Sequence, residues 1–256
     1  MYYQSIKINF LWRKRYFLSL LLTLILTYSS TLLADNTAVI AIDIGHTQAK
    51  SGASSARGVG EFQFNQTIAK KLKAQLQQYG FKNSFIINPN GKAIKLKQRT
   101  AIAARHYADV FVSIHHDSMQ PQFLSKWIYK GKSYRHGEKF KGYSLFISQK
   151  TKQKTQNTQL AHSIADHLLE RKFKPSLHHA MPIKGENRRL IDRQQGIYEF
   201  PQLAVLRTAK MPAILVECGV IINKDEELLL SDEAYQQKLA KALADGIVTY
   251  LNKNNK

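Results

Sequence analysis

The chain has 256 residues, of which 44% are hydrophobic and 22% are charged, and this balance predicts a globular protein with a core of ordinary size. Its formal net charge is +20 at pH 7. We find neither a helix-turn-helix pattern nor an aromatic-basic RNA motif, so nucleic acid is not the expected partner. The single cysteine, Cys218, excludes an intramolecular disulfide, and its place in an apolar run predicts a buried, inert thiol.

The first 34 residues differ from the rest of the chain. Four basic residues precede the apolar run Phe17–Leu26, and Ala34 stands just before the first acidic residue. This order is typical of a secretory signal peptide that is cleaved near Ala34. An uncleaved membrane anchor is the alternative, because the run extended to Ala34 approaches the ~20 residues of a spanning helix, although the polar stretch Tyr28–Thr31 interrupts it. We therefore expect an exported protein, periplasmic or associated with the cell wall, that meets a membrane only if this segment stays uncleaved.

Export changes which anionic partners are available. Residues 1–34 hold four of the 38 basic residues and no acidic ones, so the rest of the chain has 34 basic against 18 acidic residues, a net charge of +16. Outside the cytoplasm, cell-wall polymers and lipid surfaces carry negative charge. The alternative is a solvated lysine-rich surface, which accounts for most of the charge.

After residue 34, strand-like and helix-like segments alternate. This alternation predicts a single α/β domain over residues 35–256, with a twisted, mostly parallel β-sheet flanked by helices on both faces. Strands are predicted at 37–44, 84–87, 110–114, 142–148, 203–207 and 213–217, and helices from Glu61 to a stop at Gly80, at 96–107, around 160–168, and after a cap at Asp232 to about 251.

Two segments depart from this pattern. Residues 119–141 are basic and aromatic without a clear period, so we expect a long active-site loop or insertion there. Residues 174–196 are also irregular, and they contain two histidines and an arginine pair.

Three predicted strands end in residues that can bind a metal or transfer a proton. His46 follows the first strand, His115 ends the strand that starts at Val110, and Glu217 ends the last one. Ligands of open α/β sheets bind beyond the carboxyl ends of the strands. Zinc in hydrolases usually takes three His or carboxylate ligands and leaves a fourth position to water, and Glu61 can complete such a set with His46 and His115. Glu217 is then the candidate that accepts the proton of the water and passes it to the leaving amine.

Each of these residues also has a structural interpretation. A histidine after a strand is more often structural than a ligand. Glu61 could simply stabilise the amino terminus of its helix, and Glu217 could pair with one of the surplus cations.

Four short motifs follow one another along the chain. They are Asp43-Ile44-Gly45-His46, Glu61 at the start of a helix, Ser113-Ile114-His115, and the segment Met211–Gly219. In this order they resemble the zinc-dependent N-acetylmuramoyl-L-alanine amidases, the amidase_3 family of cell-wall hydrolases, over about residues 39–251. The chain departs from the family pattern in two places. Ile44 and Thr47 replace a usual Pro and Gly around the first histidine, and Val220–Asn223 replace an aromatic and small polar residues. Neither departure removes a ligand, so the resemblance still implies activity, and it implies less about loop geometry and substrate fit.

The resemblance implies a site and a reaction. It implies one Zn²⁺ per chain with His46, Glu61 and His115 as ligands, and Glu217 as the catalytic acid and base. The implied reaction is hydrolysis, by a metal-activated water, of the amide between N-acetylmuramic acid and L-alanine in peptidoglycan. Peptidoglycan is then the expected partner, with a protein activator as a further one.

Further residues are expected around this site. Asp117 shares the side of His115 in an alternating strand and is expected to accept the second imidazole N–H of a ligand histidine, with a solvated loop residue as the alternative. His116 is expected on the opposite side. His179, Asn187 and Arg188 are expected to contact substrate, because an arginine suits the free carboxylates of a stem peptide.

Two other functions compete with the amidase. A zinc carboxypeptidase or endopeptidase that acts within the stem peptide would use the same metal and the same glutamate. A catalytically silent wall-binding protein is the second alternative, and the intact set of His46, Glu61, His115 and Glu217 argues against it.

Overall fold

The computed structural model describes residues 36–254, so the predicted signal peptide or anchor lies outside the described residues. Asp35–Lys256 form one compact unit by themselves. Within the described range, no helix combines the length and the apolar character needed to cross a membrane.

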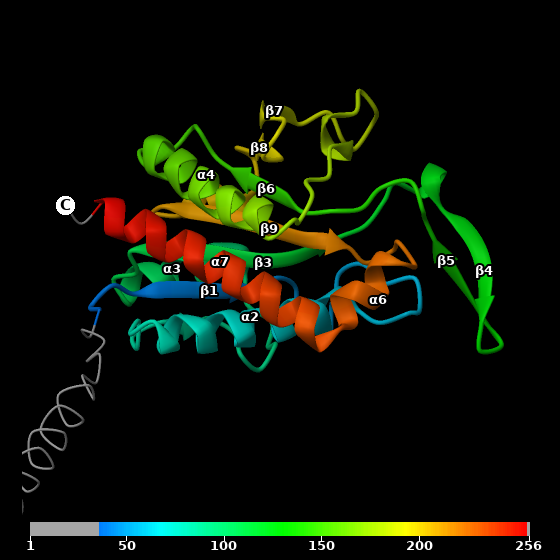
Figure 1. The fold of residues 1–256 in the computed structure, drawn as a ribbon, viewed down its shortest axis with the longest axis horizontal. Helices are drawn as coiled ribbons and strands as arrows, with labels where there is room; N and C mark the ends of the chain where they lie inside the picture. The colour runs from blue at the N-terminus through cyan, green and yellow to red at the C-terminus, as the bar shows by residue number, and fades with distance from the viewer. Residues whose placement is uncertain (1–35, 255–256) are drawn as a thin grey trace, which may run out of the picture. The chain divides into compact units, whose positions relative to one another are not determined.

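A seven-stranded sheet lies at the centre of this unit, with strand order β2-β1-β3-β9-β6-β8-β7 (Figure 1). Four of the six neighbouring pairs are parallel, and β6 and β8 run against the other five strands. The prediction of a mostly parallel sheet is therefore confirmed. The strands are β1 (Ile40–Ile44), β2 (Phe85–Ile86), β3 (Val110–Asp117), β6 (Ser144–Ile147), β7 (Arg189–Asp192), β8 (Ile197–Glu199) and β9 (Ala213–Val220).

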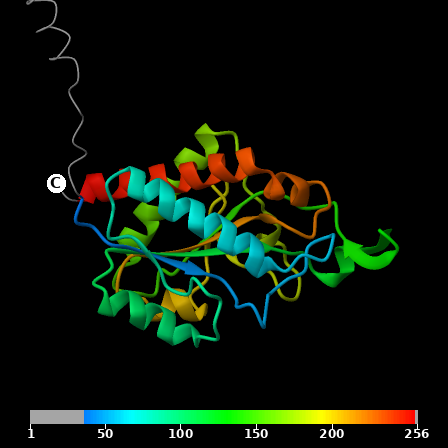
Figure 2. The same cartoon turned by 90° about the horizontal axis from the view of Figure 1, so that it is seen from below.

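Helices cover both faces of the sheet, as Figure 2 shows in side view. The helices are α2 (Glu61–Gln78), α3 (Leu96–Arg105), α4 (Lys154–Glu170), α5 (Ala204–Thr208), α6 (Glu226–Ser231) and α7 (Glu233–Asn254). The apolar residues of α2, α4 and α7 share one core with Ile40 and Ile42 of β1, whereas those of α3 and α5 share another with Ala41. Because successive strand residues point to opposite faces, a strand buried on both sides must be apolar throughout.

The predicted end of α2 at Gly80 and the predicted cap of α7 at Asp232 are confirmed. Phe64, Ile68, Leu72 and Leu76 of α2 are buried, and the helix ends just before Gly80, whose φ of +88° is one that glycine adopts freely. Asp232 precedes α7, and its Oδ1 accepts the N–H of Tyr235 at 2.8 Å, as expected of a cap. Cys218 is buried.

One local prediction was wrong. Residues 203–207 form the short helix α5 and not a strand, since an apolar run of five residues does not distinguish the two by its period. Residues 119–141, expected as a long loop or insertion, contain the 3-10 turn Pro121–Phe123 and a separate antiparallel hairpin of β4 (Ser125–Tyr129) and β5 (Lys132–His136). Lys130 and Gly131 form the tip of this hairpin, and both have positive φ.

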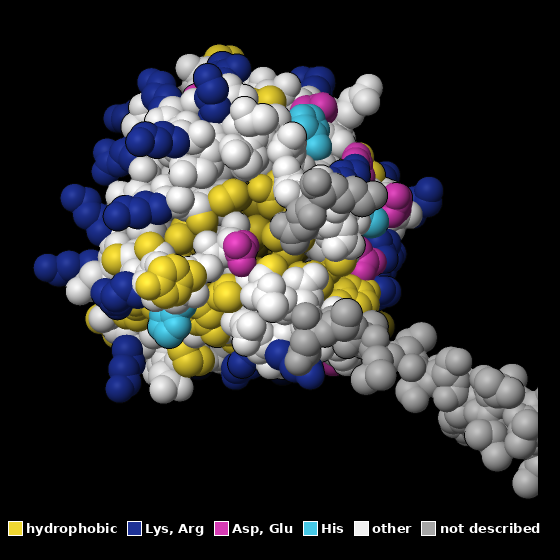
Figure 3. All heavy atoms as spheres, turned by 90° about the vertical axis from the view of Figure 1, so that its left-hand side faces the viewer, with side chains coloured by type: hydrophobic (Ala, Val, Ile, Leu, Met, Phe, Trp, Pro, Cys, Tyr) yellow, Lys and Arg dark blue, Asp and Glu magenta, His cyan; other side chains and the backbone are white. Residues whose placement is uncertain are grey.

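The surplus positive charge lies at the surface. Arg99 is the one Lys or Arg that is buried among residues 36–254. On the face shown in Figure 3, Lys and Arg side chains are spread around the periphery and do not gather in one groove. This distribution agrees with a solvated lysine-rich surface.

Candidate metal centre and active site

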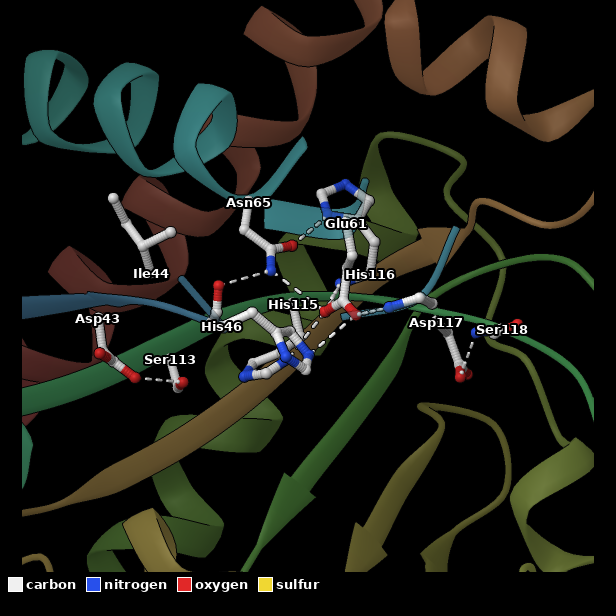
Figure 4. Close-up of polar contacts among 12 residues, drawn as sticks. Asp43, Ile44, His46, Glu61, Asn65, Ser113, His115, His116, Asp117 and Ser118 are labelled. Atoms are coloured by element: carbon white, nitrogen blue, oxygen red, sulfur yellow. Dashed lines mark hydrogen bonds and ion pairs between the residues drawn. The ribbon is translucent and has the colours of Figure 1, made fainter. Parts of the chain in front are cut away.

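His46, Glu61 and His115 converge at the carboxyl ends of β1 and β3 (Figure 4). His46 Nε2 lies 2.9 Å from Glu61 Oε2, and His115 Nδ1 lies 2.9 Å from Glu61 Oε1. One nitrogen of each imidazole and one carboxylate oxygen all lie within 4.8 Å of one another. The structure thus brings together the three residues that the sequence suggested as ligands.

Two glycines leave room for this cluster. A Cβ atom on Gly45 would lie 2.4 Å from the His115 ring, and one on Gly52 would lie 2.4 Å from Glu61 Oε2. Gly52 also has a φ of +79°, a backbone conformation that residues with a side chain rarely adopt. The glycine-rich loop between β1 and α2 therefore allows the ligands to approach one another.

Glu61 carries the negative charge of the cluster. Burial by itself raises its pKa, but hydrogen bonds from His115 and then His46 outweigh burial and hold the pKa of Glu61 below its usual range. The backbone N–H of Ala53 also donates to Oε2 at 3.0 Å. An ionised carboxylate beside two imidazole nitrogens is a donor set that suits Zn²⁺, so the residues present fit that ion.

Asn65, which the sequence reasoning missed, supports this cluster from one turn further along α2. Its Nδ2 donates to Glu61 Oε1 at 3.1 Å and to the carbonyl of Gly45 at 3.2 Å, while its Oδ1 accepts from His116 Nδ1 at 2.7 Å. Burial lowers the pKa of His116 to about 3, so that ring is neutral and donates from Nδ1. The sequence feature that could have identified Asn65 is its i, i+4 spacing from Glu61, because this spacing places both side chains on one face of the helix.

A buried ion pair holds the segment that carries His46. Arg99 Nη1 lies 2.7 Å from Asp43 Oδ1, and both side chains are at most 2% exposed. Arg99 Nη2 also donates to the carbonyl of His46 at 2.7 Å, and Ser113 donates to Asp43 Oδ2 at 2.8 Å. His46 has a φ of +65°, so Arg99 stabilises a backbone conformation that is unusual for a histidine.

Glu217 stands beside the cluster and outside its set of ligands. It is paired in register with His115 across β3 and β9. Its Oε2 is buried and has no hydrogen-bond partner among the described residues. Burial raises the pKa of Glu217 well above its ordinary value, and the nearby carboxylates of Asp117 and Glu61 raise it further.

Asp117 does not take the role expected of it. The pairing of β3 with β9 shifts between His115 and Asp117, and the extra residue of this bulge lies on β9, between Glu217 and Val220. No hydrogen bond joins Asp117 to His46 or His115 among the described residues. Asp117 Oδ2 lies 2.7 Å from His179 Nε2 and 3.1 Å from His178 Nε2, and its Oδ1 accepts the N–H of Ser118. The expectation that Asp117 orients a ligand histidine was therefore wrong.

The three expected substrate residues occupy different environments. His179 lies in the cluster with Asp117, and its Nδ1 donates to Glu186 Oε2 at 2.8 Å. Arg188 donates to the carbonyl of Glu186 at 2.9 Å and stacks on Phe200, whereas Asn187 is exposed. The structure brings His179 and Arg188 into one loop, because the N–H of Arg188 donates to the carbonyl of His179.

Two cavities flank the site. One, of about 680 Å³, reaches from His46 and His115 to apolar side chains of α3 and α5 and their preceding loops, among them Ile94, Leu203 and Val205. The other, of about 590 Å³, lies between residues 52–55 and the β4–β5 hairpin. The cluster therefore has open space on two sides.

Comparison with known proteins agrees with this geometry. The sequence model of the Amidase_3 family, described as N-acetylmuramoyl-L-alanine amidase, matches residues 40–249. The amidase AmiA of Salmonella typhimurium is 26% identical over 84% of this chain and 76% of its own length, and AmiC of Neisseria meningitidis is 30% identical over 84% of this chain and 53% of its own length.

Solved structures agree as well. An N-acetylmuramoyl-L-alanine amidase of Clostridium difficile 630 superposes with a TM-score of 0.65 at 26% identity, covering 85% of this chain and 98% of that one. The amidase Ami1 of Mycobacterium smegmatis shares the fold, with a TM-score of 0.68 at 20% identity over 86% of this chain and 99% of that one. With its family model matched over residues 40–249, the chain belongs to the Amidase_3 family of N-acetylmuramoyl-L-alanine amidases.

Proposed function

We propose that this protein is a zinc-dependent N-acetylmuramoyl-L-alanine amidase that releases stem peptides from the glycan strands of peptidoglycan. The observation that carries the proposal is the convergence of His46, Glu61 and His115 within 4.8 Å, with Glu217 in register beside them. Family membership selects the substrate, because the donor set by itself would serve any amide hydrolysis. We propose export to the periplasm or cell wall for the same reason, since peptidoglycan lies there.

His46, Glu61 and His115 are the residues that would hold the ion. A zinc ion bound there would lower the pKa of a water molecule to about 7 and polarise the carbonyl of the scissile amide. Asn65 and Arg99 keep the ligands in place, through Glu61 Oε1 and the His46 carbonyl respectively. Rigid placement of this kind reduces the reorganisation needed in the transition state.

Glu217 would carry the proton. It takes the proton from the attacking water at a carboxylate oxygen and delivers it to the amine of the leaving L-alanine. Its buried Oε2 has no partner among the described residues, so no side chain competes for that proton. Burial, which raises the pKa of Glu217, favours its protonated form, the form that donates to the leaving amine in the second step.

The flanking cavities suggest how the substrate lies. The cavity beside His46 and His115 is lined by apolar side chains together with Lys50 and Lys95, which suit the methyl groups and free carboxylates of a stem peptide. The second cavity has the exposed hairpin as one wall. We also propose that Asn187 and Arg188 contact the substrate and that a protein activator takes part.

Mass spectrometry of muropeptides tests the function directly. Purified peptidoglycan incubated with the protein should yield intact stem peptides with a free L-alanine amino terminus, and glycan strands that have lost them. A carboxypeptidase or endopeptidase would shorten or cut peptides that stay attached to glycan. A silent wall-binding protein would bind without any product, and either of these results would contradict the proposal.

A further inference from the structure

We propose that Asp117, His178 and His179 form a second metal site, distinct from the cluster of His46, Glu61 and His115, that binds one divalent transition-metal ion, with Zn²⁺ as the preferred ion. The three residues come from β3 and from the 3-10 turn His178–Ala180. Their candidate ligand atoms lie within 4.8 Å of one another, as in the first cluster. This inference does not depend on the proposed amidase function.

Both imidazoles direct Nε2 toward the same carboxylate oxygen. Asp117 Oδ2 lies 2.7 Å from His179 Nε2 and 3.1 Å from His178 Nε2. Ligand atoms around a tetrahedral zinc ion with bonds of ~2.0–2.1 Å are about 3.3 Å apart, so these separations are close to those of a coordination shell.

His178 Nε2 faces the carboxylate of Asp117 without a well-aligned hydrogen bond. Its Nε2 is buried and, despite lying 3.1 Å from Asp117, makes no hydrogen bond within the described part of the chain. The side chain is 2% exposed, so water has little access to that atom. A buried nitrogen without a hydrogen bond, aimed at a carboxylate and a second imidazole, is what a metal ligand looks like before the ion binds.

The other nitrogen of each ring is already held. His178 Nδ1 lies 2.9 Å from Ser176 Oγ, and His179 Nδ1 lies 2.8 Å from Glu186 Oε2. Gln120 in turn donates to Glu186 Oε1 at 2.8 Å. Histidines that bind metals usually donate their second N–H to a carboxylate or another oxygen in this way, which fixes the tautomer and leaves Nε2 free for the ion.

Aromatic side chains fix the orientation of the two rings. Phe140 stacks on His178 with ring centroids 4.9 Å apart, and Phe146 and Tyr198 meet His179 edge-on at 4.8 and 5.6 Å. These contacts come from residues before β6, from β6 and from β8. The rings are therefore held before any ion binds, which lowers the entropic cost of binding.

The competing arrangement contains no metal. In it, His179 is an imidazolium that donates to Asp117 and Glu186 together, and His178 is a packing residue. Zinc stoichiometry separates the two, since the metal-free arrangement predicts one ion per chain and the proposal predicts two.

The experiment uses purified full-length protein, stripped with a chelator and titrated with Zn²⁺ by calorimetry, with bound zinc measured by elemental analysis after desalting. Wild type should bind two equivalents, and H178A and H46A should bind one each. H106A, which removes an exposed histidine outside both clusters, should still bind two. Circular dichroism of each variant reports whether it folds.

A second variant guards against loss of fold. D117N keeps the shape of the side chain and an oxygen for the N–H of Ser118, but it removes the negative charge, so it should also lose one equivalent. Cobalt substitution adds a spectroscopic measurement, because the visible absorption of bound Co²⁺ should roughly halve in H178A and D117N.

Each outcome decides a different point. Two equivalents in wild type that both persist in folded H178A and D117N would overturn the proposal. One equivalent in wild type that is lost in H46A but kept in H178A would also overturn it, and would leave the proposed amidase intact. One equivalent that is lost in H178A but kept in H46A would support this site and remove the metal from the proposed function.

Discussion

His115 and Glu217 face each other directly across the parallel strands β3 and β9. Neighbouring strands lie about 4.8 Å apart, so backbone hydrogen bonds fix the distance between a candidate ligand and the candidate proton carrier. Side chains mounted on a sheet keep their geometry better than side chains on loops. The spacing of His115 and Glu217 is therefore set by the sheet, while the departures from the family pattern lie at the ends of β1 and β9 and just beyond them.

Glu217→Gln should abolish most of the activity without removing the metal. The change keeps the shape of the side chain but removes the titrating group, and general acid–base catalysis typically contributes ~10²–10⁴-fold to rate. We expect a loss of at least about a hundredfold in turnover, with zinc content and fold unchanged. Release of stem peptides, zinc content and melting temperature should be measured on one preparation.

Glu170→Gln is the matched control, because Glu170 is exposed on α4. A fall in the zinc affinity of Glu217→Gln would indicate that Glu217 is a zinc ligand. Near-normal turnover would remove it from the mechanism.

Asn65→Ala should weaken metal binding although Asn65 is not a ligand. The change leaves Glu61 Oε1 with fewer donors and leaves His116 Nδ1 and the Gly45 carbonyl without the partners they have now. Loss of such supporting contacts typically costs 10–100-fold in metal affinity, and an unsatisfied buried group costs about 1–3 kcal/mol of stability. Competition with a chelator of known affinity measures the first effect, and denaturant unfolding measures the second.

Gln63→Ala on the exposed face of the same helix is the control for Asn65→Ala. Equal zinc affinity in the two variants would show that Asn65 contributes to packing and does not support the metal ligands.

The buried pair of Asp43 and Arg99 should show strong coupling. Arg99→Met leaves an unpaired buried carboxylate and frees the His46 carbonyl, so we expect a loss of about 3–5 kcal/mol in the free energy of unfolding. Adding Asp43→Leu to Arg99→Met should recover part of that loss, because no buried charge then remains. Arg105→Met, at the exposed end of α3, should change stability little. Additive effects in the double-mutant cycle would contradict the coupling.

Stability should fall as the pH rises from 5 to 8, in part because of Glu226. Burial raises its pKa from 4.5 to about 7, although the N–H groups of Val220 and Gly142 donate to it and oppose that rise. The folded protein then binds more protons than the unfolded chain between these values, so the contribution is complete below pH 4.5 and is lost as the pH passes 7. The loss should be on the order of 3 kcal/mol.

Denaturant unfolding of metal-free protein across this pH range measures the effect of Glu226. Glu226→Gln should flatten the dependence, whereas Glu170→Gln should keep it. An identical slope in Glu226→Gln and wild type would assign the dependence to other groups.

The sequence by itself determined the class of fold and the residues of the first cluster. Apolar runs identify buried strands, and the 3.6-residue stripe of α2 identifies a helix packed on them, because both patterns arise from local geometry. His46 and His115 follow such runs directly, so their meeting at one edge of the sheet follows from parallel pairing alone.

Only the tertiary structure decided the surroundings of that cluster. Asp117 contacts His178 and His179, more than 60 residues away, and no periodic pattern in the sequence encodes such a contact. The buried Arg99 likewise reaches the His46 carbonyl across 53 positions of the chain. Contacts of this kind depend on how separate elements pack, whereas a sequence pattern reports only what neighbouring residues share.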